Sequence, residues 1–173
     1  MNTPHQPLRL NVGFLLGQTI GTSRDFEFDF PRIRLGEDFS LSDFSGTARF
    51  TRTPQGLFLQ AKFQGNEALE CVRCLDIADH QLKMDFSELY AFNQRSVSES
   101  GLLVPESGYI DLEPLVREYA LLEVPINPLC KPGCKGLCRE CGQNLNKKDC
   151  GHQQVKANDS FAKLESLLKA NSD

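Results

Sequence analysis

The stretch ARFTRTPQGLFLQAKF, residues 48–63, predicts the fold of this chain. Apolar residues alternate with polar ones from Ala48 to Phe50, and again from Leu57 to Phe63. This period of two is typical of a strand with one buried face, and the proline and glycine between the two runs favour a tight turn. The stretch therefore predicts a β-hairpin between two half-buried antiparallel strands.

The same period extends on both sides of the hairpin. Upstream, the aromatic residues of FEFDF (26–30) alternate, and after Pro31 the apolar positions shift in parity to residues 33–35. A shift of parity at a proline indicates a bulge or an edge strand. Downstream, a second turn is predicted at residues 65–66, and the alternation returns in LKMDF (82–86). We therefore expect an antiparallel β-meander that curls into a barrel or a sandwich-like fold.

Helical patterns near the C-terminal end make the predicted class α+β. Asp111 can cap a helix that ends before Pro125, and Pro114 falls in its first turn. Its apolar stripe consists of Leu112, Leu115, Val116 and Tyr119. Another helix is expected over residues 159–170, whereas residues 8–20 fit either an early strand or a short helix.

The predicted elements divide the chain into three parts of one intertwined domain. Residues 1–92 form a β-rich region that carries the first CxxC pair, and residues 93–108 mix Ser, Glu, Gly and Pro as a mobile loop does. Residues 109–173 contain a helix, a cysteine-rich segment and a C-terminal helix.

The cysteines have the spacing of metal ligands. Six of the seven form close pairs, and the seventh lies two residues before a histidine. The eight candidate ligands are Cys71, Cys74, Cys130, Cys134, Cys138, Cys141, Cys150 and His152. Two or three residues between cysteines let both sulfurs face one ion, and four such ligands satisfy tetrahedral Zn²⁺. Reduced structural thiols are an alternative, whereas the odd cysteine count and the lack of an export signal argue against disulfides.

Two arrangements of these ligands are open. In the preferred one, Cys71, Cys74, Cys130 and Cys134 hold one Zn²⁺, and Cys138, Cys141, Cys150 and His152 hold a second. In the alternative, the two CxxC pairs form one ribbon around a single ion, and the other cysteines are free. The spacing fits neither ferredoxin pattern, which disfavours an iron–sulfur cluster.

Nothing in the sequence predicts catalysis. Four protein ligands leave no open position on zinc, and the sequence contains no GxSxG, P-loop or HExxH pattern. We expect no enzymatic activity and no small-molecule substrate. No apolar run approaches the roughly 18 to 20 residues that span a bilayer, so a soluble, intracellular protein that binds no membrane is expected.

The charge distribution bears on possible partners. The net charge is −4 and the sequence pI about 5.4, which disfavours a general affinity for nucleic acid. The cysteine-rich segment is nevertheless basic, and its candidate RNA contacts are Lys135, Arg139, Lys147 and Lys148. An equally good interpretation is that these cations offset the negative charge of zinc-bound thiolates.

Three stretches, GTSRDFEF (21–28), LECVRCL (69–75) and LCKPGCKGLCRECGQNLN (129–146), resemble the YceD family of large ribosomal RNA subunit accumulation proteins. The segments at 110–112 and 161–164 also follow the order of that family. The resemblance implies a role in accumulation, processing or stability of large-subunit ribosomal RNA in bacteria or plastids, without established enzymatic activity. The family often has a proline where this chain has Arg139, which leaves the sulfur spacing intact.

Three hypotheses follow. In the first, a zinc-stabilised protein acts on ribosomal RNA or on a ribosomal protein during large-subunit assembly. In the second, an acidic module binds a ribosomal protein or an assembly factor through its acidic face and residues 93–108, without contacting RNA. In the third, which is weaker, the cysteines sense oxidation by releasing zinc.

Overall fold

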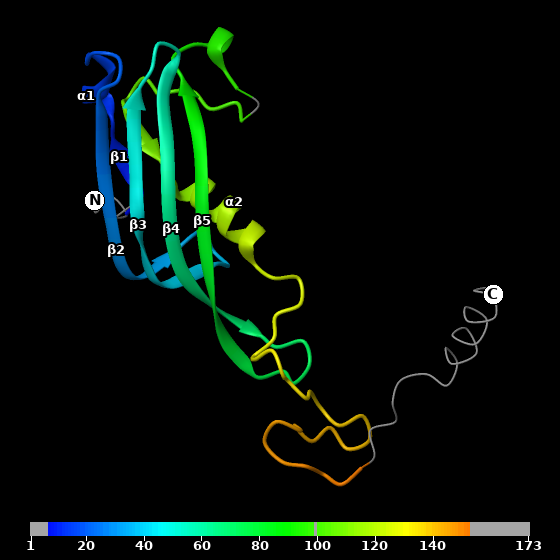
Figure 1. Ribbon diagram of the computed structural model, residues 1–173. Coiled ribbons are helices and arrows are strands. Elements are labelled where there is room, and N and C mark those ends of the chain that lie inside the picture. The colour runs from blue at the N-terminus through cyan, green and yellow to red at the C-terminus, as the bar shows by residue number, and fades with distance from the viewer. Residues whose placement is uncertain (1–6, 99, 153–173) are drawn as a thin grey trace, which may run out of the picture.

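The computed structural model describes residues 7–98 and 100–152, and its main feature is a four-stranded antiparallel sheet (Figure 1). The strands follow one another across the sheet in the order β2-β3-β4-β5. They are β2 (Ser23–Arg34), β3 (Ser40–Arg52), β4 (Gly56–Glu70) and β5 (Ile77–Ala91). The predicted antiparallel meander is confirmed.

The β3–β4 hairpin turns where the sequence predicts it. Arg52 pairs with Leu57, and within the turn the backbone N–H of Thr53 donates to the carbonyl of Gly56 at 2.8 Å. The alternating apolar residues of both strands are buried: Ala48, Phe50, Leu57, Leu59, Ala61 and Phe63. They form the apolar face of the sheet, and their polar neighbours face solvent.

The shift of parity at Pro31 marks an edge strand, as predicted. Within the described part of the chain, β2 pairs only with β3, and the register passes from Phe30–Phe44 to Arg32–Ser42 without a pair at the proline. Proline has no N–H to donate to a sheet ladder and is therefore tolerated at an edge.

The predicted turn at Gly65 and Asn66 is wrong, because β4 continues through both residues to Glu70. Gly65 serves close packing instead: a Cβ at this position would lie 3.1 Å from the Cβ of Leu41 on β3. A glycine in a strand often marks such a close approach rather than a turn.

A second, smaller layer covers the apolar face of the sheet. It contains β1 (Arg9–Asn11) paired antiparallel with β6 (Tyr109–Asp111), the short helix α1 (Gly13–Leu16) and the longer helix α2 (Glu113–Glu123). Side chains from this layer are buried in the same core as the sheet residues, including Leu8, Val12, Leu15, Ile110, Leu112 and Val116. Figure 1 shows α2 crossing behind the sheet.

The sheet does not close into a barrel, so that part of the predicted fold is wrong. The edge strands β2 and β5 do not pair with each other. Closure is unnecessary because the small layer covers the apolar face and removes it from water. Residues 8–20, for which a strand or a helix was expected, contain both β1 and α1.

Helix α2 ends before Pro125 as predicted, but it begins at Glu113, so Leu112, which was expected in the helical stripe, is the N-cap residue instead. The carboxylate of Asp111 accepts a hydrogen bond of 2.9 Å from the backbone N–H of Glu113, Pro114 lies in the first turn, and Glu123 precedes Pro125 by two residues. The helix expected over residues 159–170 lies outside the described part of the chain. Among the described residues, no helix has the length and apolar character needed to cross a bilayer.

The segment after β5 folds back against the sheet. It begins with a 3₁₀ turn, η1 (Gln94–Ser96), and then the backbone of Ala91 bonds to Leu102 and Val104 at 3.0 and 2.9 Å. Leu102 and Val104 are half-buried against the core. The described residues of this loop are therefore anchored at the end of β5, while its mobility stays a prediction.

The β4–β5 ribbon extends beyond the rest of the sheet. β3 pairs with β4 only as far as Asn66, whereas residues 67–70 of β4 pair only with β5. Figure 1 shows this part of the ribbon reaching towards the cysteine-rich segment that follows α2.

Candidate metal centres

The first CxxC pair lies at the tip of the β4–β5 ribbon. Cys71 and Cys74 occupy the turn between the two strands, in which the N–H of Leu75 donates to the carbonyl of Cys71 at 2.9 Å. The chain segment after α2 docks on this turn, since Val72 donates to the carbonyl of Pro128 and Leu137 to that of Arg73, both at 3.0 Å. The docking brings Cys130 and Cys134 to the first pair.

These four residues form the first cysteine group: Cys71, Cys74, Cys130 and Cys134. Their sulfurs all lie within 4.8 Å of one another, with 3.7 Å between Cys71 and Cys134 and 3.5 Å between Cys74 and Cys130. A tetrahedral Zn²⁺ with Zn–S bonds of about 2.3 Å holds its sulfurs roughly 3.8 Å apart. A disulfide would need about 2.0 Å, so the arrangement fits a metal ion and not a pair of disulfides.

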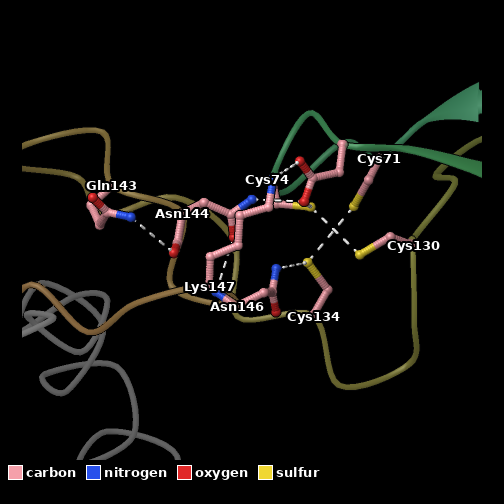
Figure 2. A network of polar contacts seen from close by, with 9 residues as sticks. Cys71, Cys74, Cys130, Cys134, Gln143, Asn144, Asn146 and Lys147 are labelled. Atoms are coloured by element: carbon pink, nitrogen blue, oxygen red, sulfur yellow. Dashed lines mark hydrogen bonds and ion pairs between the residues drawn. The ribbon is translucent and has the colours of Figure 1, made fainter.

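Polar side chains surround the first cysteine group on one side (Figure 2). The side-chain N–H of Asn146 donates to the sulfur of Cys134 at 3.2 Å. Asp76, two residues after Cys74, accepts from Asn144 at 2.8 Å and from Lys147 at 2.7 Å. The two contacts of Asp76 join the ribbon to the cysteine-rich segment independently of a metal.

The thiols of the first group differ in acidity. Burial raises the pKa of Cys71, but backbone N–H groups of Cys130 and Arg73 outweigh burial and lower this pKa to about 6. Asn146 lowers the pKa of Cys134 through its hydrogen bond. The backbone N–H of Asp76 favours the thiolate of Cys74, yet burial and the neighbouring sulfurs raise its pKa to about 12. A divalent ion would replace the protons that such crowded thiols retain.

The second cysteine group consists of Cys138, Cys141, Cys150 and His152, whose ligand atoms also lie within 4.8 Å of one another. The Cys138 sulfur is 3.8 Å from Nδ1 of His152. Backbone N–H groups of Cys141 and Glu140 lower the pKa of Cys138 to about 6. Cys138 is buried, whereas Cys141 and His152 are exposed, so this group is more open to solvent than the first.

The turns that carry the ligands share one backbone feature. Each of three cysteines is followed by a residue in the left-handed region: Leu75 after Cys74 (φ 61°), Gly142 after Cys141 (72°) and Gly151 after Cys150 (75°). Glycine adopts this conformation without a Cβ clash, whereas leucine is strained in it. In two of these turns the next backbone N–H reaches the cysteine sulfur, from Asp76 to Cys74 and from His152 to Cys150.

The structure brings the eight predicted ligands together in the preferred arrangement. The two CxxC pairs lie in different groups, which disfavours the single ribbon made from both. The polar residues Asp76, Asn144 and Asn146 were not predicted. The nearest signal for them is the QNLN run after Cys141, but the sequence does not show which sulfur an amide reaches.

The four candidate RNA contacts, Lys135, Arg139, Lys147 and Lys148, are all exposed. Lys147 forms an ion pair with Asp76, which raises the pKa of this lysine. Among the described residues, the other three cations form no ion pair. The segment therefore presents Lys135, Arg139 and Lys148 to solvent, while Lys147 supports the ribbon.

A family model described as Large ribosomal RNA subunit accumulation protein YceD matches residues 59–168. This chain belongs to the YceD family. The match includes most of β4, all of β5 and α2, and both cysteine groups. The YceD resemblance of the cysteine segments is thereby confirmed.

Individual YceD relatives match smaller parts of the chain. An uncharacterized protein of Mycobacterium tuberculosis is 34% identical over 110 residues, which are 60% of this chain and 52% of that protein. The Large ribosomal RNA subunit accumulation protein YCED homolog 1, chloroplastic, of Arabidopsis thaliana is 42% identical over 52 residues, 29% of this chain and 16% of that protein. The chain spans about half the length of the mycobacterial relatives. No solved structure matches it significantly.

Proposed function

We propose that this chain is a zinc-stabilised, non-enzymatic factor that supports accumulation of large-subunit ribosomal RNA during ribosome assembly. The family match across both cysteine groups is the observation that carries the proposal. The plant relative is named for the same role. The proposal places the protein in the bacterial cytoplasm, where ribosomes are assembled.

The proposed role of zinc is structural. The first cysteine group would hold one ion and the second would hold another, each with four protein ligands and no open position. A bound ion supplies folding free energy by joining segments that are distant in sequence. In the first group these segments are the ribbon tip at residues 71–74 and residues 130–134 after α2.

The cellular test is the ratio of large-subunit to small-subunit ribosomal RNA after deletion of the gene. We expect the ratio to fall and to be restored by the wild-type chain. A Cys74→Ser chain should not restore it, whereas Ser87→Ala, an exposed change on the sheet, should. An unchanged ratio in the deletion strain would reject the proposed function.

Direct contact with RNA is the finer part of the proposal, and it involves the exposed cations of the cysteine-rich segment. A triple variant, Lys135→Glu, Arg139→Glu and Lys148→Glu, avoids the lysine bound to Asp76. If each cation contacts one phosphate of single-stranded RNA, the salt dependence of log K should lose a slope of about 2. Unchanged affinity and slope would favour the second candidate, a partner protein without RNA contact. The supporting observation for that candidate is a cleft beside α2 that is lined by Glu88, Asp111 and Glu118.

A further inference from the structure

A cleft of about 660 Å³ lies between α2, the end of β5 and the loop that precedes β6. Its volume falls within the range of about 300 to 1,000 Å³ that is usual for ligand sites. Its apolar lining includes Leu102 from the loop, Ile110 from β6 and Leu115 from α2. Tyr119, which also lines the cleft, stacks from α2 on Phe86 of β5 with the ring centroids 4.1 Å apart. The cleft therefore lies on the helix-covered side of the sheet.

The charged residues of this cleft are all acidic: Glu88, Asp111 and Glu118. Among the residues that the structure describes, no lysine, arginine or histidine lines it. Within the described part of the chain, none of the three carboxylates forms an ion pair, although Glu88 accepts from the Tyr119 hydroxyl at 2.8 Å and Asp111 caps α2. Arg9 lies opposite Asp111 in the β1–β6 pairing but does not line the cleft, so the described lining itself carries a net negative charge.

Tyr90 is a second and independent sign of a ligand. Its side chain lines the cleft and is only 5% exposed, with its ring against Phe50 in the core. Burial raises the pKa of this phenol, and the nearby carboxylates of Glu88 and Asp111 raise it further. The hydroxyl nevertheless forms no hydrogen bond with any described residue. Among the described residues, the fully enclosed side-chain N or O atom without a partner is Nε2 of His80, so the Tyr90 hydroxyl is reached from the cleft and is free to hydrogen-bond a ligand there.

We propose that this cleft binds a lysine or arginine side chain presented by a partner protein. The cation would face the three carboxylates, and Tyr90 would accept one of its N–H donors. The alkyl part of the side chain would pack on the apolar lining, as long cationic side chains do at other surfaces. An RNA phosphate would meet only negative charge here, so the cleft favours a protein ligand. That this partner takes part in ribosome assembly rests on the proposed function, whereas the preference for a cation rests on the cleft alone.

The test uses the full chain and a fluorescein-labelled decapeptide of alternating lysine and leucine. Fluorescence anisotropy is compared with that of two matched peptides, one with Nε-acetyl-lysine and one with glutamate at the lysine positions. We expect the lysine peptide to bind at least tenfold more tightly than either. Tyr90→Phe should weaken binding about three- to tenfold without lowering the melting temperature, because one charge-assisted hydrogen bond is lost in the complex and none in the free protein.

Charge variants on α2 complete the design. Glu118→Gln, in the cleft, should weaken binding about three- to tenfold, whereas Glu123→Gln, exposed on the same helix outside the cleft, should change it less than twofold. Three outcomes would overturn the proposal. The lysine peptide could bind no more tightly than the acetyl-lysine peptide, or it could fail to bind at millimolar concentration. The third outcome is unchanged affinity in both Tyr90→Phe and Glu118→Gln. A normal ribosomal RNA ratio in the deletion strain would reject only the proposed function, because the peptide assay does not depend on RNA.

Discussion

Asn146 makes two contacts that can be separated by substitution. Its amide N–H donates to the Cys134 sulfur, and its amide oxygen accepts from the backbone N–H of Lys135 at 2.9 Å. Asn146→Asp keeps the acceptor but places an anion beside a thiolate. Loss of a hydrogen bond to a metal ligand typically lowers metal affinity about 10- to 100-fold. We therefore expect the affinity for one of the two zinc ions to fall by this factor. A competition titration with a chelating dye would measure it.

Gln143→Ala is the matched control for this prediction. Gln143 lies in the same run, and among the described residues its side-chain amide donates only to the carbonyl of Asn144, at 3.4 Å. Its replacement should leave zinc affinity within about threefold of the wild-type value. Equal affinities for Asn146→Asp and Gln143→Ala would show that the N–H···S contact does not tune the site.

Thiol acidity predicts how metal binding depends on pH. Cys71 and Cys138 have pKa values lowered from 9.0 to about 6. When the pKa of a thiol is lower in the folded than in the unfolded protein, its thiolate form stabilises the fold. This stabilisation is fully present above the ordinary thiol pKa and is lost as the pH falls through 6. Zinc requires thiolates. We therefore expect zinc to be retained at pH 7.5 and released increasingly below about pH 6, as measured by dye absorbance; full retention at pH 4.5 would contradict this.

The structure groups the eight predicted ligands as the sequence led us to expect, whereas the sequence missed their polar neighbours. Local spacing is enough to identify Cys138 and Cys141 as a pair, because one turn places both sulfurs. Asp76 reaches Asn144 and Lys147 only after the ribbon and the cysteine-rich segment have docked. Such contacts depend on tertiary structure, so no local pattern predicts them.

At the scale of elements, a glycine inside β3 is required for the pairing with β4. A Cβ on Gly46 would lie 2.1 Å from the backbone carbonyl of Lys62. Because backbone atoms of a central strand cannot move aside, Gly46→Ala should destabilise the protein by about 3 kcal/mol, a drop of roughly 6 to 12 °C in Tm. Gly17→Ala, which meets no atom within 4 Å, should change stability by less than about 0.5 kcal/mol. Equal Tm values for the two variants would show that the strands can separate locally.

The strands were predictable because alternation reports directly on one buried face. The interpretation of Gly65 and Asn66 as a turn failed because a glycine that permits close packing against Leu41 has the same local signature as a turn glycine. The prediction of a barrel was wrong for a different reason. Alternation shows that a face is buried but not what buries it, and here β1, β6, α1 and α2 cover it.

At the scale of the whole molecule, the two cysteine groups should differ in their effect on stability. The first group joins residues about sixty positions apart in sequence, whereas the second lies within residues 138–152. Cys71→Ser should reduce zinc from two ions to one and lower Tm by about 10 °C or more, because a long-range link is lost. Cys141→Ser should also leave one ion but change the Tm of the sheet by only a few degrees.

Elemental analysis and circular dichroism melting curves on the same samples would check both variants. An unchanged Tm for Cys71→Ser would contradict the structural role of the first group. Two ions in either variant would contradict the assignment of that cysteine as a ligand. The test also bears on the prediction of one intertwined domain, since a sheet that melts independently of zinc would be a separate folding unit.

The overhanging β4–β5 ribbon has a further consequence for the newborn chain. Cys71 and Cys74 are translated more than fifty residues before Cys130. The four strands pair with sequence neighbours, and α2 also precedes Cys130, so the sheet can form while translation is still under way. Metal capture at the ribbon tip must wait until residues 130–134 emerge from the ribosome. A metal ion bound by the first cysteine group would therefore show that synthesis has passed residue 134.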